Sequence, residues 1–162
     1  MIHCGIDVGS RSIKLVFVEE AATGLAVRAR HILFPGELDL ADAVTQAYAD
    51  GLSAMGIDAA QVATVMATGA FRKFVDCADD DVTEVSSAAR GAAFVCPVAR
   101  TVIEVGAEEV RVVKNDAAGH ALDFSANDKC ASGAGSFAES MARALQLSLA
   151  DFGAAAMRST TV

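Results

Sequence analysis

Apolar positions in the N-terminal part of the chain follow the two spacings that distinguish strands from helices. Short apolar runs bounded by turn residues indicate strands, and apolar residues recurring every three or four positions indicate helices. The segment 39–55 has the helical spacing, with Leu40, Val44 and Ala47 on one face. The pattern predicts a β-β-β-α-β-α unit with strands near 2–8, 12–19, 25–33 and 61–67 and helices at 39–55 and 83–94.

The same pattern begins again near Thr101. Three strands are expected from there to about Ser125, followed by an amphipathic helix from about Ser136. From Phe152 onward, small and polar residues give no sign of another strand. We therefore expect the chain to be either a fragment of a longer protein or a degenerate remnant that needs a partner.

An internal repeat underlies the two units. Residues 6–16 match residues 103–113 without a gap, and the match pairs Asp7 with Glu104 and a glycine with a glycine two positions later. Each copy is an apolar strand ending in a carboxylate, then a glycine turn, then a second strand with a basic residue in the same place. The repeat predicts two equivalent hairpins in two related sheets.

The turns of these hairpins are candidate phosphate-binding sites. Glycine lets the backbone approach an oxyanion closely, and successive turn N–H groups bind phosphate oxygens. A carboxylate beside such a turn can hold Mg²⁺, directly or through water. The predicted phosphate-binding residues are Gly9, Ser10, Arg11 and Ser12 in the first copy and Gly106 and Ala107 in the second. Asp7 and Glu104 are the candidate catalytic carboxylates, and Asp7 is also the candidate magnesium ligand.

Cys130 lies in a loop of small residues directly before the helix that is expected from about Ser136. The first N–H groups and the positive dipole end of that helix are expected to point back at the loop. Such an environment favours the thiolate and suits a bound anion or an iron–sulfur cluster. The alternative is an ordinary buried cysteine beside a tight turn.

Both hairpins resemble the phosphate loops of a known superfamily. Gly5–Ser10 is similar to the first phosphate loop of the actin, sugar-kinase and heat-shock-chaperone ATPases, and Ile103–Gly106 is similar to the second. The resemblance implies an α/β, ribonuclease-H-like or actin-like ATPase fold. It assigns 1–98 to a first β-β-β-α-β-α lobe and 101–162 to the incomplete start of a duplicated second lobe.

One branch of the superfamily resembles the chain more closely. The Cys130 motif, Ala67–Gly69 with Arg72 after it, and Glu84–Ser86 are similar to the activators of 2-hydroxyacyl-CoA dehydratases and the ATPase subunits of benzoyl-CoA reductase. Arg72 itself can reach a phosphate or a partner, or be an ordinary exposed arginine after a turn. The resemblance runs nearly end to end.

This resemblance implies an electron-transfer activator that binds and hydrolyses Mg·ATP. It implies a homodimer or a paired ATPase subunit with a [4Fe–4S] cluster at the interface, Cys130 being one ligand from each subunit. The cluster would pass an electron to a partner acyl-CoA dehydratase or benzoyl-CoA reductase. Because such a cluster ordinarily needs four thiolates and a dimer supplies two copies of Cys130, we expect the isolated chain to be free of cluster.

Two other functions remain open. One is a non-catalytic pseudo-ATPase subunit, or a fragment of such a complex. The other is a small-molecule kinase of the sugar or acetate type, which shares the phosphate loops but does not require Cys130.

The second loop departs from the superfamily in ways that weaken the case for hydrolysis. Glu104 stands where aspartate is usual, and Ala88 stands where relatives often carry histidine. Glu108 and Glu109 add negative charge beside the loop. A like charge about 5 Å away costs on the order of 3 kcal/mol at an effective dielectric near 20. We therefore expect weak nucleotide binding there unless Mg²⁺ or outward-pointing side chains offset the repulsion.

Composition narrows the remaining classes. The chain has 162 residues, is 53% hydrophobic and carries a net charge of −8, with its 13 basic residues scattered. Scattered basic residues on an acidic chain argue against a nucleic-acid surface, and no apolar run has the length of a membrane span. The four cysteines include no CxxC pair, so reduced thiols and a cytoplasmic location are expected. The acidic run Asp79–Asp81 is expected to be a solvated turn before a helix.

Overall fold

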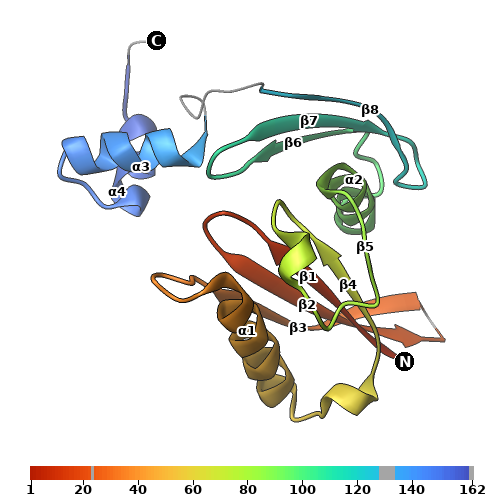
Figure 1. The fold of residues 1–162 in the computed structure, drawn as a ribbon. Helices are drawn as coiled ribbons and strands as arrows, with labels where there is room; N and C mark the ends of the chain where they lie inside the picture. The colour runs from red at the N-terminus through yellow and green to blue at the C-terminus, as the bar shows by residue number, and fades with distance from the viewer. Residues whose placement is uncertain (23, 128–133, 161–162) are drawn as a thin grey trace. The chain divides into compact units, whose positions relative to one another are not determined.

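The computed structural model describes residues 1–22, 24–127 and 134–160. The chain divides into two compact units, Met1–Ser87 and Ala88–Val162, and the division falls inside helix α2 (Glu84–Val95). Each unit has a β-sheet of its own (Figure 1).

The first unit is built on a five-stranded sheet in the order β3-β2-β1-β4-β5. Its elements are β1 (Ile2–Val8), β2 (Ile13–Ala21), β3 (Gly24–Leu33), β4 (Val62–Thr68) and β5 (Asp80–Asp81), with the 3₁₀ turns η1 (Ala59–Gln61) and η2 (Arg72–Phe74) on either side of β4. Strand β1 pairs antiparallel with β2 and parallel with β4. The C-terminal end of β1 therefore lies in the middle of the sheet.

Helix α1 (Leu40–Met55) has a defined start and a defined end. The Asp39 side chain accepts a hydrogen bond from the Ala41 N–H at 2.9 Å, which satisfies one of the donors that a helix start leaves unpaired. Gly56 ends the helix at a φ of 65°, a left-handed conformation that glycine adopts without a Cβ penalty.

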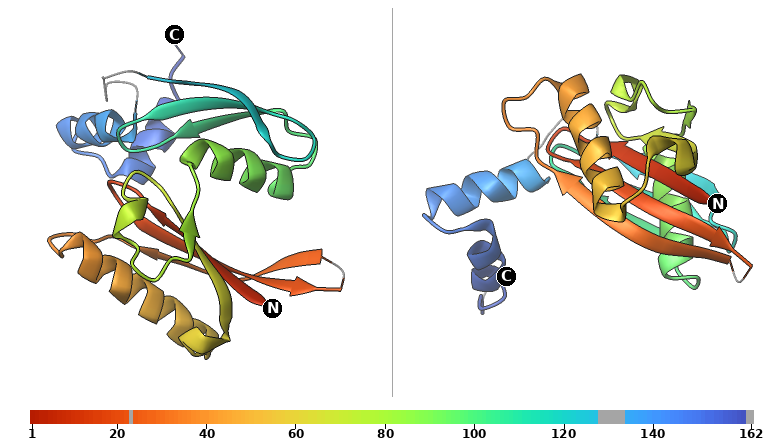
Figure 2. Two further views of the ribbon diagram at one scale, coloured as in Figure 1. Left: turned by 45° about the vertical axis from the view of Figure 1, so that its right-hand side comes forward. Right: turned by 90° about the horizontal axis from the view of Figure 1, so that it is seen from below.

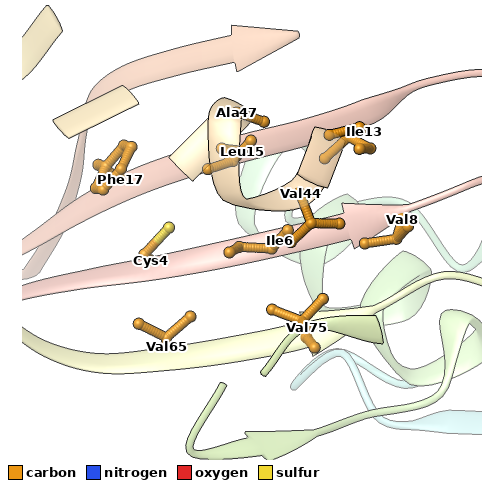
Figure 3. Close-up of a cluster of buried hydrophobic side chains, with 12 residues drawn as sticks. Cys4, Ile6, Val8, Ile13, Leu15, Phe17, Val44, Ala47, Val65 and Val75 are labelled. Atoms are coloured by element: carbon orange, nitrogen blue, oxygen red, sulfur yellow. The ribbon is translucent and has the colours of Figure 1, made fainter. Parts of the chain in front are cut away.

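Helix α1 covers one face of this sheet (Figure 2). Side chains alternate between the two faces of a strand, so every second residue of β1 and β2 points toward the helix. A Cβ at Gly51 would lie 2.7 Å from the ring of Phe17, so glycine is what allows the helix to approach β2. Burying one large aliphatic or aromatic side chain contributes roughly 1.5–3 kcal/mol. The side chains of this core include Cys4, Ile6, Val8, Ile13, Leu15, Phe17, Val44, Ala47, Val65 and Val75 (Figure 3).

The second unit has a three-stranded antiparallel sheet in the order β6-β7-β8. Its strands are β6 (Thr101–Val105), β7 (Val110–Asn115) and β8 (Ala121–Ala126). The turn between β7 and β8 is held by Asp116, whose Oδ1 accepts hydrogen bonds from the Ala118 and His120 N–H groups at 2.9 and 2.8 Å. Arg90 of α2 donates to the Ala118 carbonyl at 2.7 Å, which ties the helix to this turn.

Two helices complete the second unit: α3 (Gly135–Ala144) and α4 (Leu149–Ala156). Helix α4 is not predicted by the periodicity, because its residues are mostly small. The sequence did contain a local signal for the start of this helix, the serine at position 148. Ser148 accepts a hydrogen bond from the Asp151 N–H at 3.1 Å, the contact expected of a serine helix cap.

The elements predicted from the sequence are confirmed, with bounds that agree to within two residues. The prediction of two equivalent hairpins is confirmed too, because β1 pairs with β2 in one sheet and β6 with β7 in the other. None of the helices in the described part of the chain is both long and apolar enough to cross a membrane.

The expectation of a solvated turn at Asp79–Asp81 is confirmed only in part, because Asp79 and Asp80 are exposed but the segment is not simply a turn. Asp80 and Asp81 form the edge strand β5, which pairs with Met66 and Ala67 of β4. Asp79 accepts a hydrogen bond from the Val65 N–H at 2.7 Å. These partners lie more than ten residues away in the chain, so local composition did not reveal them.

Candidate functional site

The first hairpin turns tightly between Val8 and Ile13. The Gly9 N–H donates to the Ser12 carbonyl at 3.1 Å and closes the turn. Ser10 and Arg11 are exposed at its tip, whereas Ser12 is buried. The predicted phosphate-binding residues of the first copy therefore form a single four-residue turn between the end of β1 and the start of β2.

Asp7 is the last polar residue before this turn and pairs across the hairpin with Lys14. Lys14 Nζ lies 3.0 Å from Asp7 Oδ2, and 3.5 Å from the Ser12 carbonyl, to which it donates weakly. Both members of the ion pair are partly exposed, at 35% for the Asp7 side chain and 46% for that of Lys14. The carboxylate predicted to hold magnesium is therefore accessible and already has one cationic neighbour.

Lys14 was not among the predicted site residues. The signal that pointed to it was the basic residue at the same place in both copies of the repeat. A mobile ammonium beside a glycine turn suits the neutralisation of a bound phosphate.

Gly69 packs against the other side of Asp7. Its φ is 95°, and a Cβ at this position would lie 2.5 Å from Asp7 Oδ1 and 2.4 Å from the Val8 carbonyl oxygen. No side chain fits there, and an L-residue would also be strained at this φ. The Asp7 carboxylate thus has a backbone wall at Oδ1 and an ammonium at Oδ2.

A hollow of about 400 Å³ lies next to this carboxylate, and its lining belongs entirely to the first unit. The surface of the hollow is almost entirely apolar and includes Val16, Ile32 and Met66, and the polar residues around it are Asp7, Lys14, Arg30, His31, Thr68 and Ser87. The Ser87 hydroxyl donates to the Thr68 hydroxyl at 3.0 Å, so the start of α2 is tied to the end of β4. The first unit therefore combines an exposed turn, a carboxylate, two cations and a hollow large enough for a small ligand.

The second hairpin repeats the turn of the first. The Gly106 N–H donates to the Glu109 carbonyl at 2.8 Å, and Glu104 pairs across the hairpin with Arg111. Arg111 is the least exposed charged side chain of this hairpin, at 10%. It donates to Glu104 Oε2 at 3.1 Å and to both oxygens of Glu109, at 2.9 and 2.8 Å.

The expectation that Glu109 repels a bound nucleotide has to be revised, because Arg111 bonds both oxygens of its carboxylate. The hydrogen bonds from Arg111 hold the pKa of Glu109 below its ordinary value, so the carboxylate is stabilised in its charged form. Because the one guanidinium of Arg111 serves both Glu104 and Glu109, it offsets one of their two negative charges. Sequence alone did not reveal this pairing, because which carboxylate an arginine contacts depends on the fold of the hairpin.

The first N–H groups of α3 bind different partners from those expected from the sequence. The N–H groups of Gly135 and Ser136 donate to the carbonyls of Gly106 and Ala107, both at 2.8 Å. Two of the donors expected to face the cysteine loop therefore bind the turn of the second hairpin. Cys130 itself lies outside the described residues.

The three cysteines of the described residues are free. Burial raises the pKa of the Cys4 thiol to about 12, so it is protonated at neutral pH. Cys77 and Cys96 are exposed. Within the described residues, no three His, Cys, Asp or Glu side chains gather in a way that could hold a metal ion.

Two solved structures are closely similar to the chain. The (R)-2-hydroxyglutaryl-CoA dehydratase component A of Acidaminococcus fermentans superposes with a TM-score of 0.91 at 28% identity, over 99% of this chain and 60% of that one. The activator of the 2-hydroxyisocaproyl-CoA dehydratase from Clostridium difficile, solved with bound ADPNP, superposes with a TM-score of 0.87 at 28% identity, over 99% and 58%. The α/β, actin-like ATPase fold inferred from the two hairpins is confirmed by these matches.

Sequence comparison agrees. The activator of lactoyl-CoA dehydratase from Anaerotignum propionicum is 33% identical over 149 residues, which are 92% of this chain and 56% of the relative. The chain thus spans between 56% and 60% of the length of these three proteins. The profile of the BadF/BadG/BcrA/BcrD ATPase family matches residues 4–161. The chain belongs to the BadF/BadG/BcrA/BcrD ATPase family.

Proposed function

We propose that this chain is the nucleotide-binding part of an ATP-driven activator that acts on a partner acyl-CoA dehydratase or benzoyl-CoA reductase. The observation that carries the proposal is the first hairpin, where the Gly9–Ser12 turn, exposed at Ser10 and Arg11, adjoins the oriented carboxylate of Asp7. The family assignment and the ADPNP bound to a relative of the same fold support it.

In this proposal the first turn binds phosphate through its backbone. The Gly9 N–H closes the turn onto Ser12, so the amides of Ser10, Arg11 and Ser12 are the ones that contact phosphate oxygens. Lys14 adds a positive charge beside them. The carboxylate chemistry and partial exposure of Asp7 fit Mg²⁺, which would supply positive charge to neutralise the phosphates. Asp7 would hold it directly or through water.

The second hairpin has a supporting role in the proposal. The Gly106 N–H closes the turn, so Ala107 supplies the phosphate contact there, and Glu104 orients water or magnesium. Arg111 holds Glu104 through Oε2, which leaves Oε1 as the oxygen for this task. We further assign residues 1–98 and 101–162 to the two lobes of the ATPase, the second being represented by its first three strands and the helix after Cys130.

The proposal includes an iron–sulfur cluster with Cys130 as a ligand. The thiolate of Cys130 fits this role, because thiolates are the usual ligands of such clusters. Cys4 does not fit, since its buried thiol is protonated at neutral pH. The cluster would supply the one-electron chemistry, and a homodimer or paired ATPase subunit would bring two Cys130 thiols together. Free thiols at Cys77 and Cys96 suit a cytoplasmic location.

A pseudo-ATPase that keeps the fold without turnover is the second candidate. The observation that favours it is the engagement of Glu104 and Glu109 by the same buried guanidinium, together with Ala88 in place of histidine. A carboxylate oxygen that already accepts a hydrogen bond from arginine is less available to water or magnesium.

Titration calorimetry with ATP, in the presence and absence of Mg²⁺, tests the proposal. We expect Asp7→Ala to weaken Mg²⁺-dependent binding by about 100-fold. Glu37→Ala removes an exposed carboxylate of the same unit and serves as the matched control. Equal affinity of wild type and Asp7→Ala would overturn the assignment. Phosphate release by the wild type separates the two candidates, because only the activator turns ATP over.

A further inference from the structure

Arg72 binds two groups of the first unit at once. Its Nε donates to Asp81 Oδ2 at 2.6 Å, and its Nη1 donates to the Gly69 carbonyl at 3.3 Å. Its side chain is 28% exposed and that of Asp81 is 22% exposed, so the pair is partly shielded from water. The planar guanidinium fork can make both bonds without changing conformation.

The anchor of this arginine is itself fixed. Asp81 belongs to the edge strand β5 and pairs with Ala67 of β4, and the next residue, Val82, donates its N–H to the Ala67 carbonyl at 2.9 Å. Lys73 also contacts the Asp81 carboxylate. These two cations, Lys73 first, hold the pKa of Asp81 below its ordinary value, so it stays charged as a partner.

The contacts that begin at Asp81 and pass through Arg72 and Gly69 end at the Asp7 carboxylate. Gly69 receives the bond from Arg72 on its carbonyl and presents its α-carbon to Asp7 Oδ1. The Phe71 N–H donates to the Val8 carbonyl at 3.0 Å, so the segment between Gly69 and Arg72 is also attached to the end of β1. Movement of Gly69 away from this place would remove the wall at Oδ1.

We propose that Arg72, anchored by Asp81, is a positioning residue that holds the Gly69 turn against Asp7 and so sets the direction in which Asp7 presents its carboxylate to magnesium. The inference rests on the proposed function, in which Asp7 holds the ion. The sequence suggested that Arg72 contacts a phosphate or a partner, or is an ordinary exposed arginine. The inference differs from both, because Arg72 acts on Asp7 through Gly69. Lys14 at Oδ2 and the turn at Oδ1 then clamp the carboxylate from both sides.

Calorimetry on the full chain with Arg72→Ala and Arg72→Lys tests this assignment. We expect Arg72→Ala to weaken Mg·ATP binding by about tenfold, as loss of an outer-shell partner of a metal site does. Binding of ATP in EDTA should be unchanged, because the amides of the Gly9–Ser12 turn are untouched. Arg72→Lys keeps the ion pair with Asp81 but lacks the second arm of the fork, so it should retain the melting temperature without recovering Mg·ATP affinity.

Arg28→Ala is the matched control, since Arg28 forms an ion pair of 3.3 Å with Glu19 in the same sheet. It should bind Mg·ATP like the wild type. Wild-type affinity in Arg72→Ala would overturn the inference, as would equal losses with and without Mg²⁺. Recovery of Mg·ATP affinity by Arg72→Lys would also overturn it, because charge alone would then suffice.

Hydrogen exchange separates failure of this inference from failure of the proposed function. The Phe71 amide should exchange faster in Arg72→Ala than in the wild type, without any ligand, because its bond to Val8 depends on the held turn. If the wild type does not bind Mg·ATP, the proposed function fails, and faster exchange at Phe71 still supports Arg72 as the residue that holds the turn. Unchanged exchange at Phe71 overturns the positioning role in either case.

Discussion

The hairpins β1–β2 and β6–β7 have the same register and the same turn but different surroundings. Asp7 pairs with Lys14 as Glu104 pairs with Arg111, and the turns close with N–H to carbonyl bonds of 3.1 and 2.8 Å. Register and turn depend on residues within a few positions of one another. An ungapped repeat is therefore sufficient to reproduce them.

Burial of the apolar face is the first difference. Ile6 and Val8 are 0% exposed beneath α1, whereas their counterparts Ile103 and Val105 are 69% and 63% exposed in the second unit. The side chains are equally apolar in the two copies. What differs is the layer that covers them, which no residue of the hairpin itself determines.

Charge pairing is the second difference. Lys14 and Asp7 form one partly exposed ion pair, whereas Arg111 is buried and bonds two carboxylates. The first arrangement leaves a carboxylate accessible to a ligand. The second uses its arginine to hold the hairpin together, which suits a supporting rather than a primary role.

Core substitutions should separate the two copies most strongly. Ile6→Ala creates a cavity under α1 and should lower the free energy of unfolding of the first unit by about 3 kcal/mol. Ile103→Ala removes an exposed side chain and should cost less than about 1 kcal/mol in the second unit. Native-state hydrogen exchange at the amides of β1 and β6 measures each unit separately. Equal losses in the two units would mean that the second face is covered in the protein as it exists in solution.

Substitution of the basic residue that faces the carboxylate in each hairpin should give the next largest difference in stability between the two units. Arg111→Met leaves Glu104 and Glu109 without their shared partner and should destabilise the second unit by about 2 kcal/mol, less than for a fully buried pair because both carboxylates are partly exposed. Lys14→Met breaks a partly exposed ion pair and should cost less than about 1 kcal/mol in the first unit. The same exchange measurement applies. A larger loss for Lys14→Met would contradict the difference in burial on which the contrast depends.

The smallest effect is expected from the protonation of Glu109 in the second unit by acid. The pKa of Glu109 is held below its ordinary 4.5 by Arg111, so its contribution to stability is present above that value and is lost as the pH falls through the lowered pKa. Thermal melts between neutral pH and about pH 3 should therefore show a loss of stability that is reduced in Glu109→Gln. An identical pH profile in wild type and Glu109→Gln would show that the pair contributes nothing to acid sensitivity.

The sequence by itself determined the elements that depend on near neighbours. Strand and helix periodicity predicted the two units, and the ungapped repeat predicted the paired hairpins. The glycine turns beside Asp7 and Glu104 indicated the superfamily, and the Cys130 motif indicated the branch. Helix α4 was missed because its small residues carry little periodicity, although the cap at Ser148 was readable.

Only the tertiary structure decided which groups meet across long separations in the chain. Gly69 against Asp7, Arg72 on Asp81 and the α3 amides on Gly106 and Ala107 all join segments that no periodic pattern connects. The same holds for the covering of Ile6 by α1 and the exposure of Ile103. The physical reason is that local propensities select strands and turns residue by residue, whereas burial and ion-pair partners arise only when whole elements pack.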